Sequence, residues 1–281
     1  MGHECFDVEV TDKIGHIKMI RPEKANSMIA SFWNDLPAIV DQMSASGSVR
    51  ALVLSGEGKH FCSGMDLSVF GADPTLADSN GPKHPSRRNE RFRSTAMKLQ
   101  DSFTALERAR MPVLCAIQGA CVGGAIDMVS AVDLRYSTES AYFSIAEINI
   151  GMTADVGTLQ RMPRLVPEGV VRELAYTGRR WSAGEALAAG FVNGLYPDHE
   201  TLLTGVMEIA AQIASKSPMA IWGTKKSMQY SQEHTIADGL EYIANWNASM
   251  FDTDDMAEAF AAQTEQRDAD FPDLWPQSDG L

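Results

Sequence analysis

The sequence has little cysteine, no long apolar run and no excess of basic residues. Its four cysteines, Cys5, Cys62, Cys115 and Cys121, form no CxxC pair and no Cys/His ligand spacing, which argues against a zinc site or a disulfide scaffold. No apolar stretch reaches the ~18 residues that a membrane-spanning helix needs, and the first residues lack the pattern of a signal peptide. We therefore expect a reduced cytoplasmic protein that holds no metal and enters no membrane.

Acidic residues outnumber basic ones by 37 to 24, which gives a net charge of −13 at pH 7. This charge repels phosphate at long range and disfavours nucleic acid and anionic membranes as partners. An anionic substrate would need local basic groups. A chain of 281 residues, 44% of them hydrophobic, is long enough for one large core, alone or with a small helical appendage.

Short β-like runs and helical patterns divide the chain. Residues 6–10 and 14–20 predict a hairpin, residues 29–43 a helix, and residues 51–54, 113–117, 134–137 and 141–145 further strands. Residues 71–93 are polar and proline-rich and predict a long loop. Beyond Ser182 the pattern is helical, over residues 183–189, 202–216, 218–230, 236–250 and 254–263. The predicted fold is an α/β core over residues 1–200, which carries the site, followed by a C-terminal helical subdomain over residues 201–281.

Two glycine-containing segments follow strands. In residues 59–67, the Ser63-Gly64 step lets the backbone turn tightly and expose N–H groups, although an ordinary strand-to-helix loop has the same pattern. Gly123 and Gly124 open an apolar helix whose first N–H groups lack internal acceptors and offer an anion site. Asp127 lies one turn after Gly124, beside its amide; the alternative is an acid that stabilises the helix dipole.

Glu147 and Asp155 stand in a stretch that is otherwise nearly free of charge. Gly151 interrupts the stretch, so the chain can turn and bring both acids to one cavity. The alternative for Asp155 is an N-cap of a helix over residues 156–165. The histidines are unpaired, and no serine-hydrolase or zincin motif occurs. Arg87, Arg88 and Arg91 are expected in a solvated loop, and Lys225 and Lys226 are expected to face water.

Three segments together resemble the crotonase (enoyl-CoA hydratase/isomerase) superfamily. They are residues 21–28 (RPEKANSM), 60–67 and 119–133, in the family's order and at its spacing. Residues 154–161 (ADVGTLQR) and 133–136 (DLRY) are most similar to the Δ3,5-Δ2,4-dienoyl-CoA isomerases. Residues 215–218 and 245–250 add to this similarity, which covers nearly the whole chain.

The resemblance implies a spiral of ββα units closed by C-terminal helices and assembled as a homotrimer or homohexamer. It implies an oxyanion hole made by the Met65 and Gly124 amides, and an acyl-CoA substrate without a separate cofactor. It places Asp127, Glu147 and Asp155 as catalytic acids, and assigns substrate contacts to Ala25, Ser63, Gly64, Met65, Asp66, Leu67 and Gly124. The implied reaction converts a 3,5-dienoyl-CoA into the 2,4-dienoyl-CoA in fatty acid β-oxidation. Asp155 would act at C2 and Glu147 at C6, with Asp127 as a modulator.

Other functions remain open. An enoyl-CoA hydratase would use Asp127 and Glu147 to flank a water, but Asp127 is one methylene shorter than the glutamate of hydratases, and Asp155 would have no task. A Δ3-Δ2 isomerase needs a single base. A non-catalytic RNA-binding member is disfavoured by the charge of −13, and a scaffolding member does not need Glu147 and Asp155.

Overall fold

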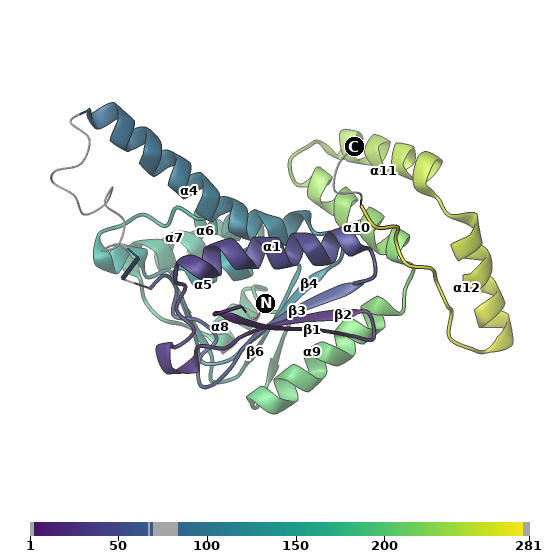
Figure 1. Cartoon of the computed structure of the whole chain (residues 1–281), viewed down its shortest axis with the longest axis horizontal. Coiled ribbons are helices and arrows are strands. Elements are labelled where there is room, and N and C mark those ends of the chain that lie inside the picture. Colours follow the sequence, from purple (N-terminus) through teal and green to yellow (C-terminus); the bar gives the residue numbers. More distant parts are fainter. Residues whose placement is uncertain (1–2, 67, 70–83, 278–281) are drawn as a thin grey trace.

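A computed structural model describes residues 3–66, 68–69 and 84–277 (Figure 1). The described strands form two sheets, one of six strands in the order β1-β2-β3-β4-β6-β9 and one of three in the order β5-β7-β8. The strands are β1 Phe6–Thr11, β2 Ile14–Met19, β3 Ala51–Gly56, β4 Val113–Ile117, β5 Ala120–Val122, β6 Leu134–Thr138, β7 Tyr142–Ser144, β8 Trp181–Ser182 and β9 Gly194–Tyr196.

The predicted hairpin is confirmed at the edge of the large sheet. β1 pairs antiparallel with β2, from Phe6 opposite Met19 to Thr11 opposite Ile14. The two connecting residues, Asp12 and Lys13, both have positive φ, as a two-residue type I′ turn requires. From β2 onward every neighbouring pair in this sheet is parallel. Parallel strands need long crossovers, and helices supply most of them.

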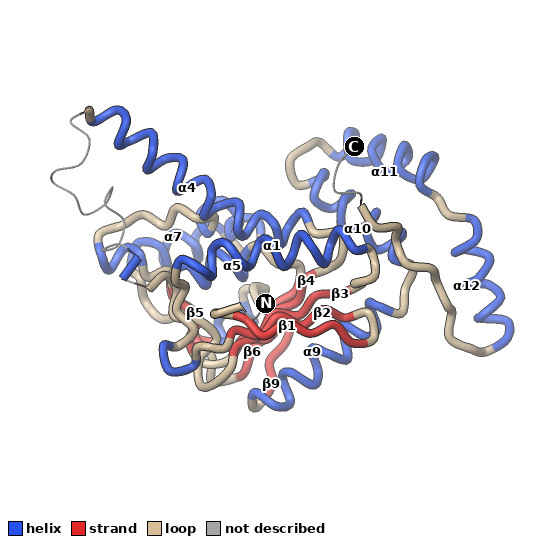
Figure 2. Tube along the Cα trace, in the orientation of Figure 1, coloured by secondary structure: helices blue, strands red, loops and turns tan. Residues whose placement is uncertain are grey.

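The large sheet is covered on both faces. Along β3, Leu52 and Leu54 pack in one apolar cluster, whereas Ala51 and Val53 pack in a second. This alternation follows from the two-residue period of a strand. The first cluster includes apolar residues of α1 (Ala30–Ser46), and the second includes those of α9 (His199–Ala214). Figures 1 and 2 show α1 and α9 on opposite sides of the sheet. Both strand faces are therefore core.

The chain advances in stacked turns. After β4 it passes through the short β5 into α5 (Gly124–Ser130), and after β6 it enters β7. β6 pairs with β4 in the large sheet while β7 pairs with β5 in the small one, so each turn lies parallel on the turn before it. The predicted class, a spiral of ββα units with C-terminal helices, is confirmed. β5 escaped prediction because it has only three residues, with Gly119 before it and Gly123 after it.

Two helical segments differ from the prediction. α4 begins at Pro85 and runs to Arg108, so a loop over residues 85–93 is wrong, whereas residues 71–83 lie outside the described residues. Pro85 occupies the first turn, where its missing N–H costs nothing, and no glycine or further proline follows within the helix. Arg87, Arg88 and Arg91 are exposed on α4. α7, Glu168–Thr177, was not predicted, although Val171 and Leu174 give it an apolar face.

The C-terminal helices confirm the predicted helical pattern, and the last two of them extend away from the sheet (Figure 1). They are α8 Ala183–Ala188, α9 His199–Ala214, α10 Pro218–Ser231, α11 Ile236–Met250 and α12 Thr253–Glu265. The chain then returns to the core, where Arg50 donates to the Phe271 carbonyl at 2.5 Å and Arg110 to the Trp275 carbonyl at 3.1 Å. Division of the chain at residue 200 remains a prediction, and the packing of α9 on the sheet favours a boundary after Ala214.

Lys225 is buried, and the prediction that it faces water is wrong. Its ammonium group donates to the carbonyls of Leu106 at 3.2 Å and Met111 at 3.0 Å, and to Asp133 at 2.8 Å. Three acceptors satisfy all three N–H bonds of an ammonium group, which lets the charge lie inside the protein. The two adjacent lysines indicated a solvent-exposed face of α10, but Lys225 lies where this helix packs on the core.

All four cysteines are buried with free thiols, as predicted for Cys115 and Cys121. None of the helices within residues 3–66, 68–69 and 84–277 combines the length and the apolar character needed to cross a membrane.

We expect Lys225→Met to lower the free energy of unfolding by about 3 kcal/mol, because it leaves buried carbonyls and a carboxylate without their donor. The neighbouring Lys226→Met, on a half-buried side chain, is the matched control and should change stability by no more than about 0.5 kcal/mol. Urea denaturation at one protein concentration measures both. Equal effects of the two substitutions would contradict the structural role of Lys225.

Candidate active site

A short backbone ladder joins the loop at Cys62 to β5. The N–H of Cys62 donates to the Ala120 carbonyl at 3.0 Å, and the N–H of Val122 donates to the Cys62 carbonyl at 3.1 Å. Asn26, from another segment, fixes the same loop. Its side-chain amide donates hydrogen bonds of 2.9–3.0 Å to the carbonyl oxygens of Glu57, His60 and Phe61. The ladder places residues 63–66 beside residues 122–124.

The backbone N–H groups of Met65 and Gly124 lie next to each other without acceptors among the described residues. A methyl group placed on Gly124 would lie 3.7 Å from the Met65 nitrogen, and one placed on Gly64 would lie 3.1 Å from the Gly124 nitrogen. Gly64 has a φ of +86°, and a methyl group there would also come within 2.6 Å of the Val122 carbonyl oxygen. Only glycine fits at this position. Two free donors side by side can stabilise a negatively charged oxygen.

Both amides open into a cavity of about 520 Å³. The structure brings most of the predicted site residues to it: Ser63, Gly64, Met65, Asp66, Gly124, Asp127, Glu147 and Asp155. Ala25 does not line the cavity; its carbonyl accepts the Ser63 N–H at 3.0 Å and so supports the loop. Leu67 lies outside the described residues. Acids from three separate segments therefore share one cavity with two free amides.

Asp127 is the most deeply buried of the three acids, with 1% of its surface exposed. Its carboxylate accepts the backbone N–H of Thr158 at 2.6 Å, at the start of α6 (Thr158–Arg161), rather than lying against the Gly124 amide. Burial, and after it the charge of Glu147, raise the pKa of Asp127 to about 7, although hydrogen bonding from Thr158 lowers it. Near neutral pH this carboxyl group is therefore only partly ionised.

Glu147 begins a single 3₁₀ turn, Glu147–Ile150, and half of its side chain is enclosed. One carboxylate oxygen, Oε1, lies 3.4 Å from where a methyl group on Gly123 would stand. The other, Oε2, is buried and has no hydrogen-bond partner in the part of the chain that the structure describes. Burial raises the pKa of Glu147, and the charge of Asp155 raises it further. Burial of an oxygen that no donor reaches disfavours the charged form of this carboxyl group.

Asp155 lines the cavity and is exposed to solvent. The alternative that it caps a helix is wrong, because α6 begins at Thr158 and Gly157 occupies its N-cap. Gln100 donates to the Asp155 carbonyl at 2.8 Å, and Arg161 donates to the Val156 carbonyl at 3.3 Å, so the backbone here is held on both sides. Partial burial raises the pKa of Asp155.

Sequence reasoning missed the apolar wall and one cation of the cavity. Trp33, Ile150, Met152 and Val156 line it, and Lys24 stands at its rim. Trp33 lies on α1 among regularly spaced apolar residues, where nothing distinguishes a cavity wall from the core. Lys24 supplies a local positive charge of the kind that a chain of net charge −13 needs to receive an anion.

The described residues contain no group of three or more histidine, cysteine or acidic side chains arranged to hold a metal ion. That the protein works without a metal or a separate cofactor remains a prediction.

Comparison with known proteins supplies the family. Residues 9–274 match the sequence model of the family described as Enoyl-CoA hydratase/isomerase. A human mitochondrial Δ(3,5)-Δ(2,4)-dienoyl-CoA isomerase is 38% identical over 90% of this chain and 76% of its own length. The peroxisomal enzyme of that name from Arabidopsis thaliana is 39% identical over 96% and 97%. The crystal structure of an enoyl-CoA hydratase from Bacillus anthracis superposes with a TM-score of 0.85 at 27% identity, covering 98% of this chain and 100% of that one.

We expect Asp127→Asn to gain stability relative to the wild type as pH rises. A carboxyl whose folded pKa is raised contributes stability below its unfolded pKa, near 4, and loses this contribution as pH approaches 7. Asparagine keeps the oxygen that accepts the Thr158 N–H but cannot ionise. Between pH 5 and pH 8 the difference in unfolding free energy should shift in favour of the variant by about 2–3 kcal/mol.

Urea denaturation at pH 5, 6.5 and 8 measures this difference. Asp127→Ala, which removes the acceptor of Thr158, should be less stable than Asp127→Asn at every pH. A difference between wild type and Asp127→Asn that does not change with pH would show that Asp127 titrates at its ordinary value.

Proposed function

The chain belongs to the enoyl-CoA hydratase/isomerase family, and we propose that it converts a 3,5-dienoyl-CoA into the 2,4-dienoyl-CoA in fatty acid β-oxidation. One observation carries the proposal: two amides without acceptors, Met65 and Gly124, open into the same cavity as three carboxyl groups of raised pKa. The names of the relatives from human and Arabidopsis thaliana support it. Acyl-CoA thioesters are the substrates that these residues suit.

The two amides are proposed to bind the thioester oxygen. Loss of a proton from C2 moves negative charge onto this oxygen, and donors that already point at it need not reorganise during the reaction. One such donor contributes roughly 3–4 kcal/mol of transition-state stabilisation in other enzymes. Gly64 and the ladder at Cys62 fix both donors before substrate arrives. The amides thus lower the barrier to enolate formation.

The isomerisation needs two proton transfers at opposite ends of a conjugated system. An ionised carboxylate removes a proton from C2, and the electron pair spreads through C3, C4 and C5 to C6. A protonated carboxyl then delivers a proton to C6, which leaves double bonds at C2 and C4. Asp155, at the solvent edge, is proposed as the base, and Glu147, which has a raised pKa and a buried oxygen without a partner, as the acid.

Asp127 is proposed to act through its neighbours. It holds the Thr158 N–H and so fixes the segment that carries Asp155. In its ionised form its charge disfavours ionisation of Glu147, which keeps a proton available for C6. In the hydratase alternative, Asp155 would lack a task.

The CoA moiety is proposed to lie along Ser63, Gly64, Met65 and Asp66, with Lys24 at the rim of the cavity. Hydrogen bonds from Ser68 and Ser27 lower the pKa of Asp66 to about 2, so this side chain is an acceptor and not an acid. An acceptor at this place suits hydroxyl or amide donors of the CoA chain. The roles of Ala25 and Leu67 as substrate contacts remain predictions.

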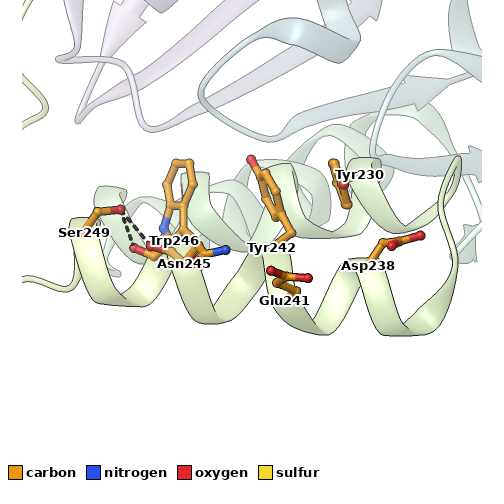
Figure 3. A pocket seen from close by; sticks show the side chains of 7 residues that line it. All are labelled: Tyr230, Asp238, Glu241, Tyr242, Asn245, Trp246 and Ser249. Atoms are coloured by element: carbon orange, nitrogen blue, oxygen red, sulfur yellow. Dashed lines mark hydrogen bonds between the residues drawn. The ribbon is translucent and has the colours of Figure 1, made fainter.

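A homotrimer or homohexamer is proposed on the evidence of the C-terminal helices. Large apolar side chains are exposed on α10, α11 and α12, and such clusters mark association surfaces. They are Met228, Ile236, Leu240, Met250, Met256 and Phe260. Figure 3 shows Tyr230, Tyr242 and Trp246 in a row between α10 and α11, in an open groove of about 450 Å³. A solution mass of a single chain would contradict this assembly.

A cytoplasmic location is likewise a proposal. Four buried free cysteines favour a reducing compartment, while the names of the curated relatives include mitochondrial and peroxisomal proteins. Fluorescence microscopy of the tagged full-length protein in its own cell tests the compartment, and signal confined to an organelle would overturn it.

We expect the purified protein to raise the absorbance of a conjugated dienoyl thioester when it is given 3,5-octadienoyl-CoA, with no incorporation of water. Asp155→Asn should lower kcat at least 1000-fold, because asparagine cannot take the C2 proton, while KM changes less than threefold. Asp268→Asn, outside the site, is the matched control and should keep full activity.

Two results would contradict this assignment. Rapid hydration of a 2-enoyl-CoA without any turnover of the diene would make the protein a hydratase. A fully active Asp155→Asn variant would remove Asp155 from the reaction and leave the base unassigned.

A further inference from the structure

The segment that carries Asp155 has no long helix or strand of its own to hold it in place. Residues 151–157 form neither helix nor strand, and α6 contributes only the four residues Thr158–Arg161. A catalytic base must nevertheless lie within hydrogen-bond reach of the proton that it removes. Contacts from neighbouring helices therefore have to fix the position of this carboxyl group.

One face of α4 supplies such contacts. Gln100, Thr104 and Glu107 are spaced by four and then three residues, so their side chains lie on the same side of the helix. The side-chain amide of Gln100 donates to the Asp155 carbonyl at 2.8 Å. Thr104 and Glu107 instead accept hydrogen bonds from Arg161, at the end of α6. α4 thus holds the segment at Asp155 and again at Arg161.

The Arg161 side chain connects α4 to the backbone beside Asp155. Its guanidinium group donates to both carboxylate oxygens of Glu107, at 2.8 and 2.9 Å, and to the Thr104 hydroxyl at 3.1 Å. It also donates to the carbonyl of Val156, the residue after Asp155, at 3.3 Å. A planar guanidinium group with five N–H bonds can reach all of these acceptors at once, whereas the three N–H bonds of a lysine start from a single atom.

Gly157 makes room for this guanidinium group. A methyl group on Gly157 would overlap Nη1 of Arg161, and the φ of +135° there is one that side chains rarely adopt. The guanidinium group therefore lies directly against the backbone. The Arg161 side chain is only 15% exposed and is paired with Glu107, so its charge is neutralised locally. What Arg161 supplies to Asp155 is thus position rather than charge.

We propose that Arg161 and Gln100 are positioning residues for the catalytic base, and that they act by fixing the backbone of Asp155 and Val156 against α4. The inference rests on the proposed function, in which Asp155 removes the C2 proton. Asp127, on α5, accepts the Thr158 N–H at 2.6 Å and holds the same segment from another helix. The carboxylate reaches C2 only while both helices hold this segment.

Arg161→Lys tests the proposal on the full-length protein, because lysine keeps the charge but not the planar fork of donors. With 3,5-octadienoyl-CoA, kcat should fall at least tenfold while KM changes less than threefold, since a displacement of about 1 Å can cost roughly 100-fold in rate. Arg164→Lys is the matched control. Arg164 forms an exposed ion pair with Glu233 at 3.5 Å, and its replacement should leave kcat within twofold of the wild type.

A double variant separates positioning of the base from general damage to the fold. In the Asp155→Asn background, Arg161→Lys should change the remaining rate by less than twofold, because its effect passes through the Asp155 carboxylate. Single-turnover reactions with excess enzyme measure this rate. A loss of the same size in both backgrounds would assign Arg161 a purely structural role and overturn the proposal.

Gln100→Met is a second test, on an exposed side chain, and it decides the matter if Arg161→Lys does not fold. It removes one hydrogen bond to the Asp155 carbonyl, so kcat should fall by roughly fivefold with little change in KM. Full activity of either variant would overturn the proposal. A wild type that does not isomerise the diene would instead reject the proposed function itself, and this outcome is visible before any variant is made.

Discussion

The short ladder between Cys62 and residues 120–122 is the constraint on which the site depends. It joins the loop at Cys62 to β5, and by doing so it sets the Met65 and Gly124 amides side by side, with no acceptor for either among the described residues. Gly64 makes this approach sterically possible, because any side chain there would meet the Val122 carbonyl. Two unpaired donors inside a fold are costly unless a ligand uses them. The backbone therefore holds both donors in position before a negatively charged oxygen forms.

The acids around these amides are controlled by burial and by one another. No cation pairs with Asp127, Glu147 or Asp155 among the described residues, and all three have raised pKa values. Their environments differ in degree: Asp127 is sealed and bonded to Thr158, Glu147 is half enclosed, and Asp155 reaches solvent. A graded series of this kind can hold a proton at one end and an ionised carboxylate at the other.

Much of the fold was predictable from sequence because its strands and helices carry strong local patterns. The hairpin, the buried strands and the helices beyond residue 182 follow from apolar spacing, and the spiral followed from resemblance. Elements of three or four residues, such as β5 and α6, are formed by pairing with distant segments and leave little local signal. α4 was hidden because Pro85 looked like a loop residue, although it suits the first turn of a helix. Lys225 was misjudged because burial of an ammonium group depends on acceptors from three other segments.

The sequence allowed the three acids to be predicted as catalytic residues, but it did not allow their contacts to be predicted. Charged residues among apolar neighbours in the sequence indicated a cavity. The sequence could not show that Asp127 accepts a hydrogen bond from Thr158, that Asp155 does not cap a helix, or that Glu147 lines two cavities. These facts arise where α5, the 3₁₀ turn and α6 meet. Trp33 and Met152 line the cavity without any sign in the sequence, since apolar residues of a wall and of a core look alike.

A crystal structure of the protein with a bound 2,4-dienoyl-CoA tests the central claim most directly. The account predicts that the thioester oxygen accepts hydrogen bonds from both the Met65 and Gly124 amides, that C2 faces Asp155, and that C6 lies against Glu147. A thioester oxygen that binds elsewhere, while these two amides stay without a partner, would contradict it.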